Sequence, residues 1–325
     1  MIIAIPDDYQ DCVRHLDCFA KLARHEVRIF NDSVKGTDAL AERFADAEAI
    51  VLTRERTRID AALLDRLPQL RLISQTGKLA GHVDLAACTA RGVRVAEGSG
   101  AGSATAEIAW TLAQASRRHL VSEANRLRDG QWQGHLGQQL SGQRLGVWSY
   151  GRIGRQVAGY GRAFGMKVWV WGREASTAAA RADGFEVAPS REAFFAQSDV
   201  ISLHVRLSAD TTGIVTADDL ARMKPTALLV NTSRAELIAR GALEHALAQG
   251  RPGFAAVDVY EEEPVLGANH PLLRLPNVLC TPHIGYVEKD NYERYFGIAF
   301  DNILAYAEGR LTEVVSPAAS PAAAG

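Results

Sequence analysis

The sequence is poor in cysteine, which limits the kinds of site it can hold. Four cysteines are scattered over 325 residues, at Cys12, Cys18, Cys88 and Cys280, and no two of them have C-x-x-C spacing. That pattern argues against a zinc site or a redox-active dithiol. We therefore expect reduced thiols, some of them buried, and no metal site.

An excess of one charge and a long apolar run are lacking too. Lys and Arg number 36 against 38 Asp and Glu, so the net charge is −2, and no basic tract stands out. Nucleic-acid and membrane-surface partners are therefore not expected. No apolar run is long enough to span a bilayer, and residues 1–8 lack the basic and long apolar regions of a signal peptide. A cytoplasmic protein is expected.

What the sequence does contain is a regular alternation of short apolar segments with amphipathic ones. The expected strands are Ile2–Ile5, Val27–Phe30, Ala49–Leu52, Arg71–Ser74, Val93–Ala96, Leu145–Trp148, Lys167–Trp171, Val200–Val205, Ala227–Asn231, Ala255–Val259 and Val278–Thr281. Helices are expected between them, for example at Asp11–Arg24, Asp84–Arg91 and Gly241–Gln249. Such alternation predicts an α/β fold built on parallel sheets.

A glycine-rich break, Gly98–Gly102, separates the two halves of the chain. The helix after it should begin with Ser103 or Thr105 as its N-cap and run to about Arg118. A break of this kind predicts a crossing between domains. A last helix, Asp290–Arg310, is expected to pack back on the first domain, and the chain from Val314 onward is expected to be a mobile tail.

Residues 145–173 read as a strand, a tight turn, a helix and a second strand. The turn is Ser149-Tyr150-Gly151-Arg152-Ile153-Gly154, where a dinucleotide-binding unit has G-x-G-x-x-G. Gly151 and Gly154 keep the positions of phosphate approach and close helix packing, whereas Ser149 replaces the first glycine. The segment predicts a pyrophosphate at the helix N-terminus, although an ordinary crossover without nucleotide has the same pattern.

Three residues suited to one reaction follow three different late strands. Arg234, Glu263 and His283 come after the strands that end near Asn231, Val259 and Thr281. In a doubly wound sheet these ends line the rim that holds the nucleotide. A 2-keto acid needs a cation for its carboxylate, a proton donor for its carbonyl oxygen and a group that orients the donor; Arg, His and Glu can fill these roles.

Each of these residues also has a structural interpretation. Arg234 could be a surface charge at a helix start, and His283 could be a histidine that serves only the fold. Glu263 belongs to an acidic run, so Glu261 or Glu262 could be the functional acid instead. In the first half of the chain, Arg54 follows a predicted strand and is either a solvated loop charge or an anion contact.

Four stretches resemble the D-isomer-specific 2-hydroxyacid dehydrogenases: SYGRIGRQ, NTSRAELI, VDVYEEEP and TPHIG. The similarity covers nearly the whole chain. It implies two parallel-sheet domains, Rossmann-like and flavodoxin-like, with a cleft between them. The substrate domain would be discontinuous, comprising 1–102 and 287–325, and the NAD(P)-binding domain would be 103–286. The resemblance also implies a homodimer with the helix after Gly98–Gly102 at its interface.

The resemblance assigns a role to most of the candidate residues. It implies that Arg234 binds substrate, that Glu263 is the carboxylate partner and that His283 is the acid/base. Gly77 and Lys78 match the loop whose amides hold the substrate carboxylate, with Arg54 as a further candidate substrate contact. The candidate cofactor contacts are Gly151, Arg152, Ile153, Gly154, Arg173, Val205, Thr211, Thr232, Ser233, Asp258 and Gly285.

Two departures from the family pattern bear on specificity. Lys78 stands where small residues are usual, which predicts extra positive charge or bulk near the substrate. Gly172 occupies the position of the acid that accepts from the ribose 2′-hydroxyl, and Arg173 follows it. An arginine there pairs with a 2′-phosphate, so NADP(H) is slightly favoured over NAD(H), with Glu174 as an alternative ribose contact.

The function these features predict is hydride transfer between NAD(P)H and a small 2-keto acid or D-2-hydroxy acid. A nucleotide-sensing corepressor-like protein of the same fold is an alternative, because such proteins keep the Arg, Glu and His set. A transferase on a Rossmann sheet, such as a methyltransferase, is a third possibility.

Overall fold

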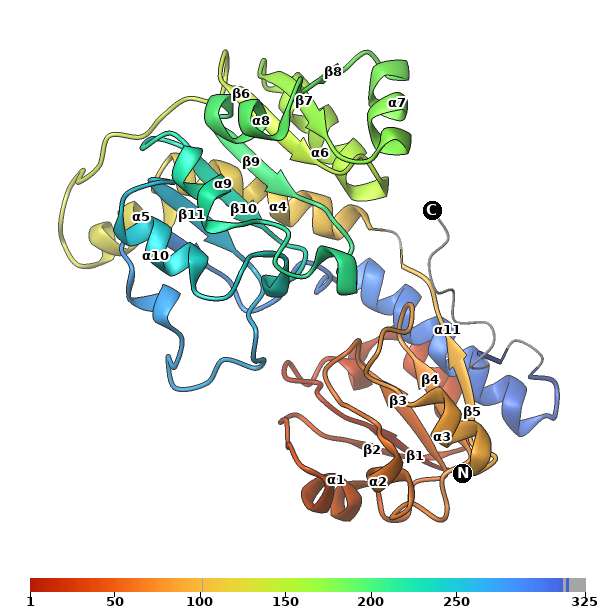
Figure 1. The fold of residues 1–325 in the computed structure, drawn as a ribbon. Helices are drawn as coiled ribbons and strands as arrows, with labels where there is room; N and C mark the ends of the chain where they lie inside the picture. Colours follow the sequence, from red (N-terminus) through yellow and green to blue (C-terminus); the bar gives the residue numbers. More distant parts are fainter. Residues whose placement is uncertain (101, 312–313, 316–325) are drawn as a thin grey trace. The chain divides into compact units, whose positions relative to one another are not determined.

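The computed structural model describes residues 1–100, 102–311 and 314–315. The chain separates into two compact units, Met1–Ala101 with Glu288–Gly325 and Gly102–Val287. Each is an α/β unit built on a parallel sheet (Figure 1). The predicted fold class, two parallel-sheet α/β domains, is confirmed.

The first unit has a five-stranded parallel sheet in the order β2-β1-β3-β4-β5. Its strands are β1 (Ile2–Ile5), β2 (Glu26–Ile29), β3 (Ala49–Leu52), β4 (Leu72–Gln75) and β5 (Arg94–Glu97). Its helices are α1 (Thr37–Phe44), α2 (Ala61–Leu64), α3 (Leu85–Ala90) and α11 (Lys289–Ala307), with 3₁₀ turns η1 (Val13–His15) and η2 (Asp17–Leu22). The order is that of flavodoxin-like sheets.

One predicted helix of this unit is wrong. Asp11–Arg24 forms the two 3₁₀ turns η1 and η2, divided by Leu16 in an extended conformation. The amides of Asp17 and Cys18 donate to the carboxylate of Glu293 on α11, at 2.6 and 3.0 Å. This long-range contact takes amides that a continuous helix would have bonded to its own carbonyls.

Helix α11 packs on the first unit, as predicted for the last helix. It lies against η2 and strand β4 (Figure 1), and the Ser74 hydroxyl donates to the carbonyl of Ala299 at 2.9 Å. Beyond it, the amide of Val315 donates to the carbonyl of Val95 at 2.7 Å. The rest of the predicted tail, 316–325, lies outside the described residues.

The second unit has a seven-stranded parallel sheet in the order β12-β11-β10-β9-β6-β7-β8. Its strands are β6 (Arg144–Trp148), β7 (Lys167–Trp171), β8 (Glu186–Val187), β9 (Val200–Leu203), β10 (Leu228–Asn231), β11 (Phe254–Val257) and β12 (Val278–Cys280). Its α-helices are α4 (Ser103–Arg117), α5 (Leu120–Arg128), α6 (Arg152–Ala163), α7 (Glu174–Ala182), α8 (Arg191–Gln197), α9 (Ala217–Arg222) and α10 (Ala242–Ala248). Its 3₁₀ turns are η3 (Ala209–Thr211), η4 (Ala235–Leu237) and η5 (Pro271–Arg274).

Both faces of the larger sheet are buried, which is why its strands read as continuous apolar runs. Alternate residues serve different faces: Val168 and Val170 belong to the core beneath α4 and α6, whereas Trp169 belongs to the opposite core with Phe194. The direction of connection reverses between β6 and β9. In open α/β sheets, ligands bind beyond the strand ends at such a switch point.

The helix after the glycine break differs from the prediction at its start. Its N-cap is Gly102, with a φ of +80°, and Ser103 is already its first residue. Its last turn holds the buried Arg117, which donates to the Gln138 side chain at 2.7 Å and to the Thr226 carbonyl at 2.6 Å. Burial lowers the pKa of Arg117 to about 10. These bonds tie the polar segment 129–143, which has no helix or strand, to the sheet.

Within the described part of the chain, no helix combines the length and apolar character needed to cross a membrane.

Candidate active site

The strand ends of the second unit are in register, and this brings their following residues to one edge. Trp148 pairs with Leu203, Leu203 with Asn231, Asn231 with Val257, and Val257 with Cys280. The residues that come next in the chain are Ser149, His204, Thr232, Asp258 and Thr281. The rim predicted from the sequence is therefore a single row of polar residues.

The glycine turn keeps its geometry although its first glycine is replaced. Ser149 has a φ of +78°, a conformation that a residue with a Cβ adopts only under strain. A Cβ on Gly154 would overlap the carbonyl oxygen of Ser149, so glycine is required there for the helix to approach the strand. The serine is thus held in the backbone conformation of the glycine it replaces.

The end of α6 has the features of a pyrophosphate site. Gly151 is its N-cap and gives no side-chain cap, so the first-turn amides have no acceptor within the helix. A Cβ added to Gly151 would meet nothing within 4 Å, which leaves open space above these amides. The amides and the dipole of a helix N-terminus attract an anion.

Two buried polar atoms on the same edge lack partners. Thr232 Oγ1 and His204 Nδ1 are both buried and make no hydrogen bond with the described residues. His204 Nε2 lies 2.9 Å from the Ser202 hydroxyl, and burial lowers the pKa of His204 to about 4, so its ring is neutral near pH 7. Unsatisfied buried polar atoms beside an uncapped helix fit a polar ligand such as a dinucleotide.

The loop that carries Arg234 is held by Asn231, a residue to which the sequence analysis gave no role. The Asn231 amide group donates to the carbonyl of Arg234 at 2.8 Å, and its oxygen accepts from the amide of Ser233 at 3.0 Å. The Ser233 hydroxyl donates to the carbonyl of Leu203 at 2.7 Å. A buried asparagine that ends an apolar strand was the available signal for this role.

His283 and Glu263 are in direct contact. His283 Nδ1 lies 2.5 Å from Glu263 Oε2, and Glu263 Oε1 accepts from the amide of Tyr260 at 3.0 Å. His283 Nε2 makes no hydrogen bond within the described parts of the chain. The backbone of His283 is left-handed, with a φ of +52°. The ring is therefore fixed at one nitrogen and leaves the other available.

Arg234 acts on the same carboxylate through its charge. Burial raises the pKa of Glu263, but the hydrogen bond and charge of His283, the Tyr260 amide and the charge of Arg234 outweigh it, so this pKa is lowered overall. Arg234, Glu263 and His283, which are far apart in sequence, thus share one electrostatic environment in the second unit. Glu263 is ionised at neutral pH.

Asp258 organises the loop that carries His283. Its fully buried carboxylate accepts from the Thr281 hydroxyl at 2.6 Å, from the Ile284 amide at 2.9 Å and from the Gly285 amide at 2.8 Å. Burial raises the pKa of Asp258 despite these bonds. Any contact of Asp258 with a nicotinamide is additional to this structural role.

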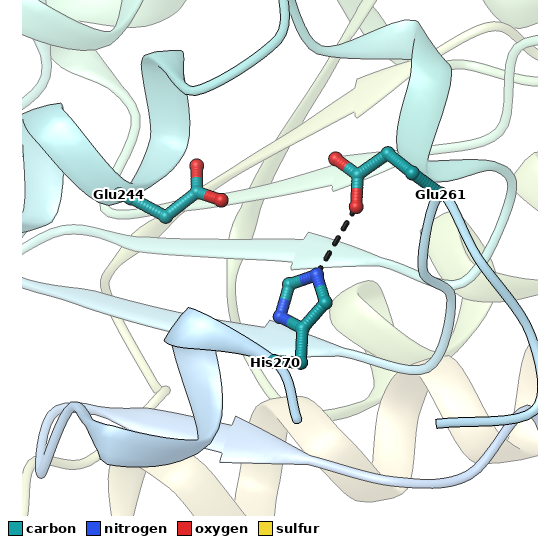
Figure 2. A group of neighbouring side chains, drawn as sticks. All are labelled: Glu244, Glu261 and His270. Atoms are coloured by element: carbon teal, nitrogen blue, oxygen red, sulfur yellow. Dashed lines mark hydrogen bonds and ion pairs between the residues drawn. The ribbon is translucent and has the colours of Figure 1, made fainter. Parts of the chain in front are cut away.

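Of the two other glutamates considered for the functional acid, Glu262 is exposed and Glu261 has a histidine of its own. Glu261 Oε2 lies 3.1 Å from His270 Nε2 (Figure 2). His270 Nδ1 accepts from the Leu272 amide at 3.3 Å, which places the ring proton on Nε2. Both nitrogens of His270 have partners. Because Glu261 pairs with His270 and Glu263 pairs with His283, Glu261 is not the partner of His283.

Glu244 lies close to this second pair, and the three side chains form the one group of possible metal ligands found among the described residues (Figure 2). A histidine ligand normally donates a proton from its other nitrogen to a second partner. Here that nitrogen of His270 faces an N–H group. The hydrogen bonds account for the Glu261–His270 contact without a cation.

In the first unit, Arg54 lies against Gly77. A Cβ on Gly77 would overlap the Arg54 guanidinium, and Gly77 has a φ of +85°. The guanidinium lies 5.5 Å from the ring centre of Tyr295. Within the described chain, the amides of Gly77 and Lys78 donate no hydrogen bond. Adjacent free amides beside a guanidinium form a setting for a carboxylate.

The comparisons with known proteins agree with this geometry. Residues 110–285 match the family model described as the NAD-binding domain of D-isomer-specific 2-hydroxyacid dehydrogenases. A glyoxylate reductase from Aeropyrum pernix is 36% identical over 83% of this chain and 82% of its own. The chain belongs to the D-isomer-specific 2-hydroxyacid dehydrogenase family.

Solved structures extend the similarity to the whole fold. An oxidoreductase from Ralstonia solanacearum has a TM-score of 0.95 and 54% identity, and covers 99% of this chain and 98% of its own. A phosphoglycerate oxidoreductase from Vibrio cholerae has a TM-score of 0.93 and 51% identity, and covers 95% and 99%. This family member is an NAD(P)-dependent 2-hydroxyacid oxidoreductase, and nothing favours the corepressor-like alternative.

Several residues that were candidates for binding cofactor or substrate contact other parts of the protein, and one makes no described side-chain contact. Thr211 lies in η3, where its hydroxyl donates to the carbonyl of Arg206 at 2.8 Å. Lys78, expected to add positive charge, forms an ion pair with Glu97. Arg173 is exposed at the N-cap of α7 and makes no ion pair or side-chain hydrogen bond with the described residues, whereas Glu174 pairs with Arg181 at 3.3 Å.

Proposed function

We propose that this dehydrogenase reversibly reduces a small 2-keto acid to the D-2-hydroxy acid, with His283 as acid/base, Glu263 as its partner and Arg234 as the substrate clamp. One observation carries this assignment: Glu263 fixes His283 at Nδ1, while Nε2 has no partner among the residues that the structure describes. The nicotinamide, when bound, supplies the hydride chemistry.

In the proposed reaction, His283 gives a proton from Nε2 to the carbonyl oxygen during reduction and takes it back during oxidation. Ionised Glu263 keeps the ring oriented and offsets its positive charge. Arg234 pairs with the substrate carboxylate and polarises the carbonyl. Arg54, Gly77 and Lys78 are proposed as further substrate contacts.

The proposed cofactor contacts follow the fit of the α6 turn and the strand ends. Gly151, Arg152, Ile153 and Gly154 would hold the pyrophosphate, and Thr232 and Ser233 would lie along the nicotinamide ribose. The remaining proposed cofactor contacts are Asp258, Val205, Thr211 and Gly285.

NADP(H) is proposed as the favoured cofactor, because Arg173 has no described partner while Glu174 is paired with Arg181. Cofactor preference is measured as the ratio of kcat/KM with NADPH to that with NADH. Arg173→Ala should lower this ratio about tenfold, since one charge-assisted contact to the 2′-phosphate is lost. An unchanged ratio rejects this role of Arg173.

A homodimer is proposed through the region of α4, the helix after Gly98–Gly102, together with α5 and the segment after it. This surface exposes large apolar side chains, with Leu127 61%, Trp132 74% and Leu136 95% exposed. Large exposed apolar side chains favour association. Sedimentation of the protein and of Leu127→Asp tests the proposal; a monomeric wild-type protein contradicts it.

The activity itself is tested by absorbance at the nicotinamide band. Glyoxylate, hydroxypyruvate, pyruvate and longer keto acids are each supplied with NADPH and NADH. We expect turnover with at least one short keto acid, and its D-hydroxy acid should be oxidised in reverse. The absence of turnover with every keto acid would overturn the proposed reaction.

A further inference from the structure

In the first unit, each of the two cations proposed to contact substrate is paired with a carboxylate. Lys78 forms an ion pair with Glu97, and Arg54 Nη2 lies 3.4 Å from Glu55 Oε1. Lys78 is 72% exposed, whereas the Glu97 side chain is only 23% exposed. The carboxylate is thus the more buried partner and the lysine the more exposed one.

Glu97 is built into the fold. It ends β5 and pairs in register with Gln75, the last residue of β4. Its second carboxylate oxygen accepts from the amide of Leu79 at 2.9 Å. One carboxylate therefore holds both the backbone of the Gly77–Leu79 segment and the charge of Lys78.

We propose that Glu97 is a specificity residue that restricts this enzyme to 2-keto acids with a single negative charge, a proposal that rests on the proposed function of the same loop. In the proposed function, Arg234, Arg54 and the amides of Gly77 and Lys78 all serve the one carboxylate of the substrate. A second anionic group on the substrate needs a further cation. Lys78 can supply it only by leaving Glu97, and Glu97 would then repel the substrate.

Hydroxypyruvate and 3-phosphohydroxypyruvate form a matched pair for the test, because they differ only in the phosphate. We expect the wild-type kcat/KM for hydroxypyruvate to be at least about tenfold higher than that for 3-phosphohydroxypyruvate. The ratio of these two values is the quantity compared between variants. Glu97→Gln should shift the ratio three- to tenfold, roughly, toward the phosphorylated acid, since the charge is lost while the amide oxygen still accepts from Leu79.

Lys78 provides the decisive second variant. In Glu97→Gln with Lys78→Met, the shift should be smaller than in Glu97→Gln alone, because the released cation is gone and only the loss of repulsion remains. Glu42→Gln, which removes an exposed charge from α1 of the same unit, should leave the ratio unchanged. A shift of the same size with and without Lys78 would show that Glu97 acts by repulsion alone and would overturn the pairing.

A wild-type preference for the phosphorylated acid, or a ratio that Glu97→Gln does not move, overturns the proposal while the proposed reaction stands. Calorimetric binding of the two acids to the protein loaded with the oxidised cofactor compares their affinities without turnover. Equal affinities there, unchanged in Glu97→Gln, reject the role of Glu97 even if no keto acid is reduced.

Discussion

His283 and His270 each pair with a glutamate from the same acidic run, Glu263 and Glu261, yet they are held in opposite ways. Glu263 contacts His283 at Nδ1, at 2.5 Å, and Nε2 has no described partner. Glu261 contacts His270 at Nε2, and Nδ1 accepts a backbone amide. A histidine can transfer protons to a ligand only through a nitrogen that the protein leaves available, so the two pairs are not equivalent.

The charged groups beside the two histidine–glutamate pairs also differ. The charge of Arg234 helps to lower the pKa of Glu263. The second pair instead has another carboxylate, Glu244, beside it. His283 also has a left-handed backbone, whereas His270, with a φ of −125°, has an ordinary extended one as the cap of η5. Of the two histidines, it is His283, where the chemistry is proposed, that has the strained backbone.

The largest expected effect separates the two histidines. His283→Ala should lower kcat about a thousandfold, because the proton donor is removed, and should leave NAD(P)H binding measured by fluorescence nearly unchanged. His270→Ala should keep kcat within about threefold and lose about 1 kcal/mol of stability with the cap of η5. Comparable loss of kcat in both variants would contradict the distinction.

The two glutamates should differ by a smaller factor. Glu263→Gln keeps the size of the side chain but not its charge, so we expect kcat to fall about a hundredfold and the pH profile of kcat to change shape. Glu261→Gln is the matched control and should retain nearly full kcat. An unaltered pH profile in Glu263→Gln would show that Glu263 does not act through His283.

The smallest effect concerns acid stability. The pKa of Glu263 is lower in the folded protein than in the unfolded chain, so its contribution is present above about pH 4.5 and is lost as the pH falls through the folded value. From pH 6 to pH 3.5, the urea midpoint should therefore fall more steeply in the wild-type protein than in Glu263→Gln. Expressed as free energy of unfolding, the wild-type protein should lose about 1–2 kcal/mol more than the variant over this range. Parallel curves would remove the link between Glu263 and acid stability.

Local sequence patterns predicted the elements that depend on local interactions. Apart from the two-residue edge strand β8, which was not predicted, the strands of both parallel sheets and the turn before α6 could be predicted from apolar runs and glycine positions, with strand ends shifted by a residue or two. The Asp11–Arg24 helix was wrong because Glu293, far along the chain, binds the amides of Asp17 and Cys18. The N-cap of α4 was wrong because Gly102, in a left-handed conformation, took the position expected of Ser103 or Thr105.

The candidate site shows the same division. The sequence by itself determined which residues end the strands, because strand formation depends on the apolar period and the polar residues that interrupt it. It could not choose between Glu261 and Glu263, because neighbouring residues of a loop diverge in space. Nor could it show that Lys78 is paired with Glu97, because that contact joins residues that are distant in sequence. Only the tertiary structure decided which carboxylate meets which histidine, since that depends on the long-range register of β10, β11 and β12 and on the loop held by Asp258.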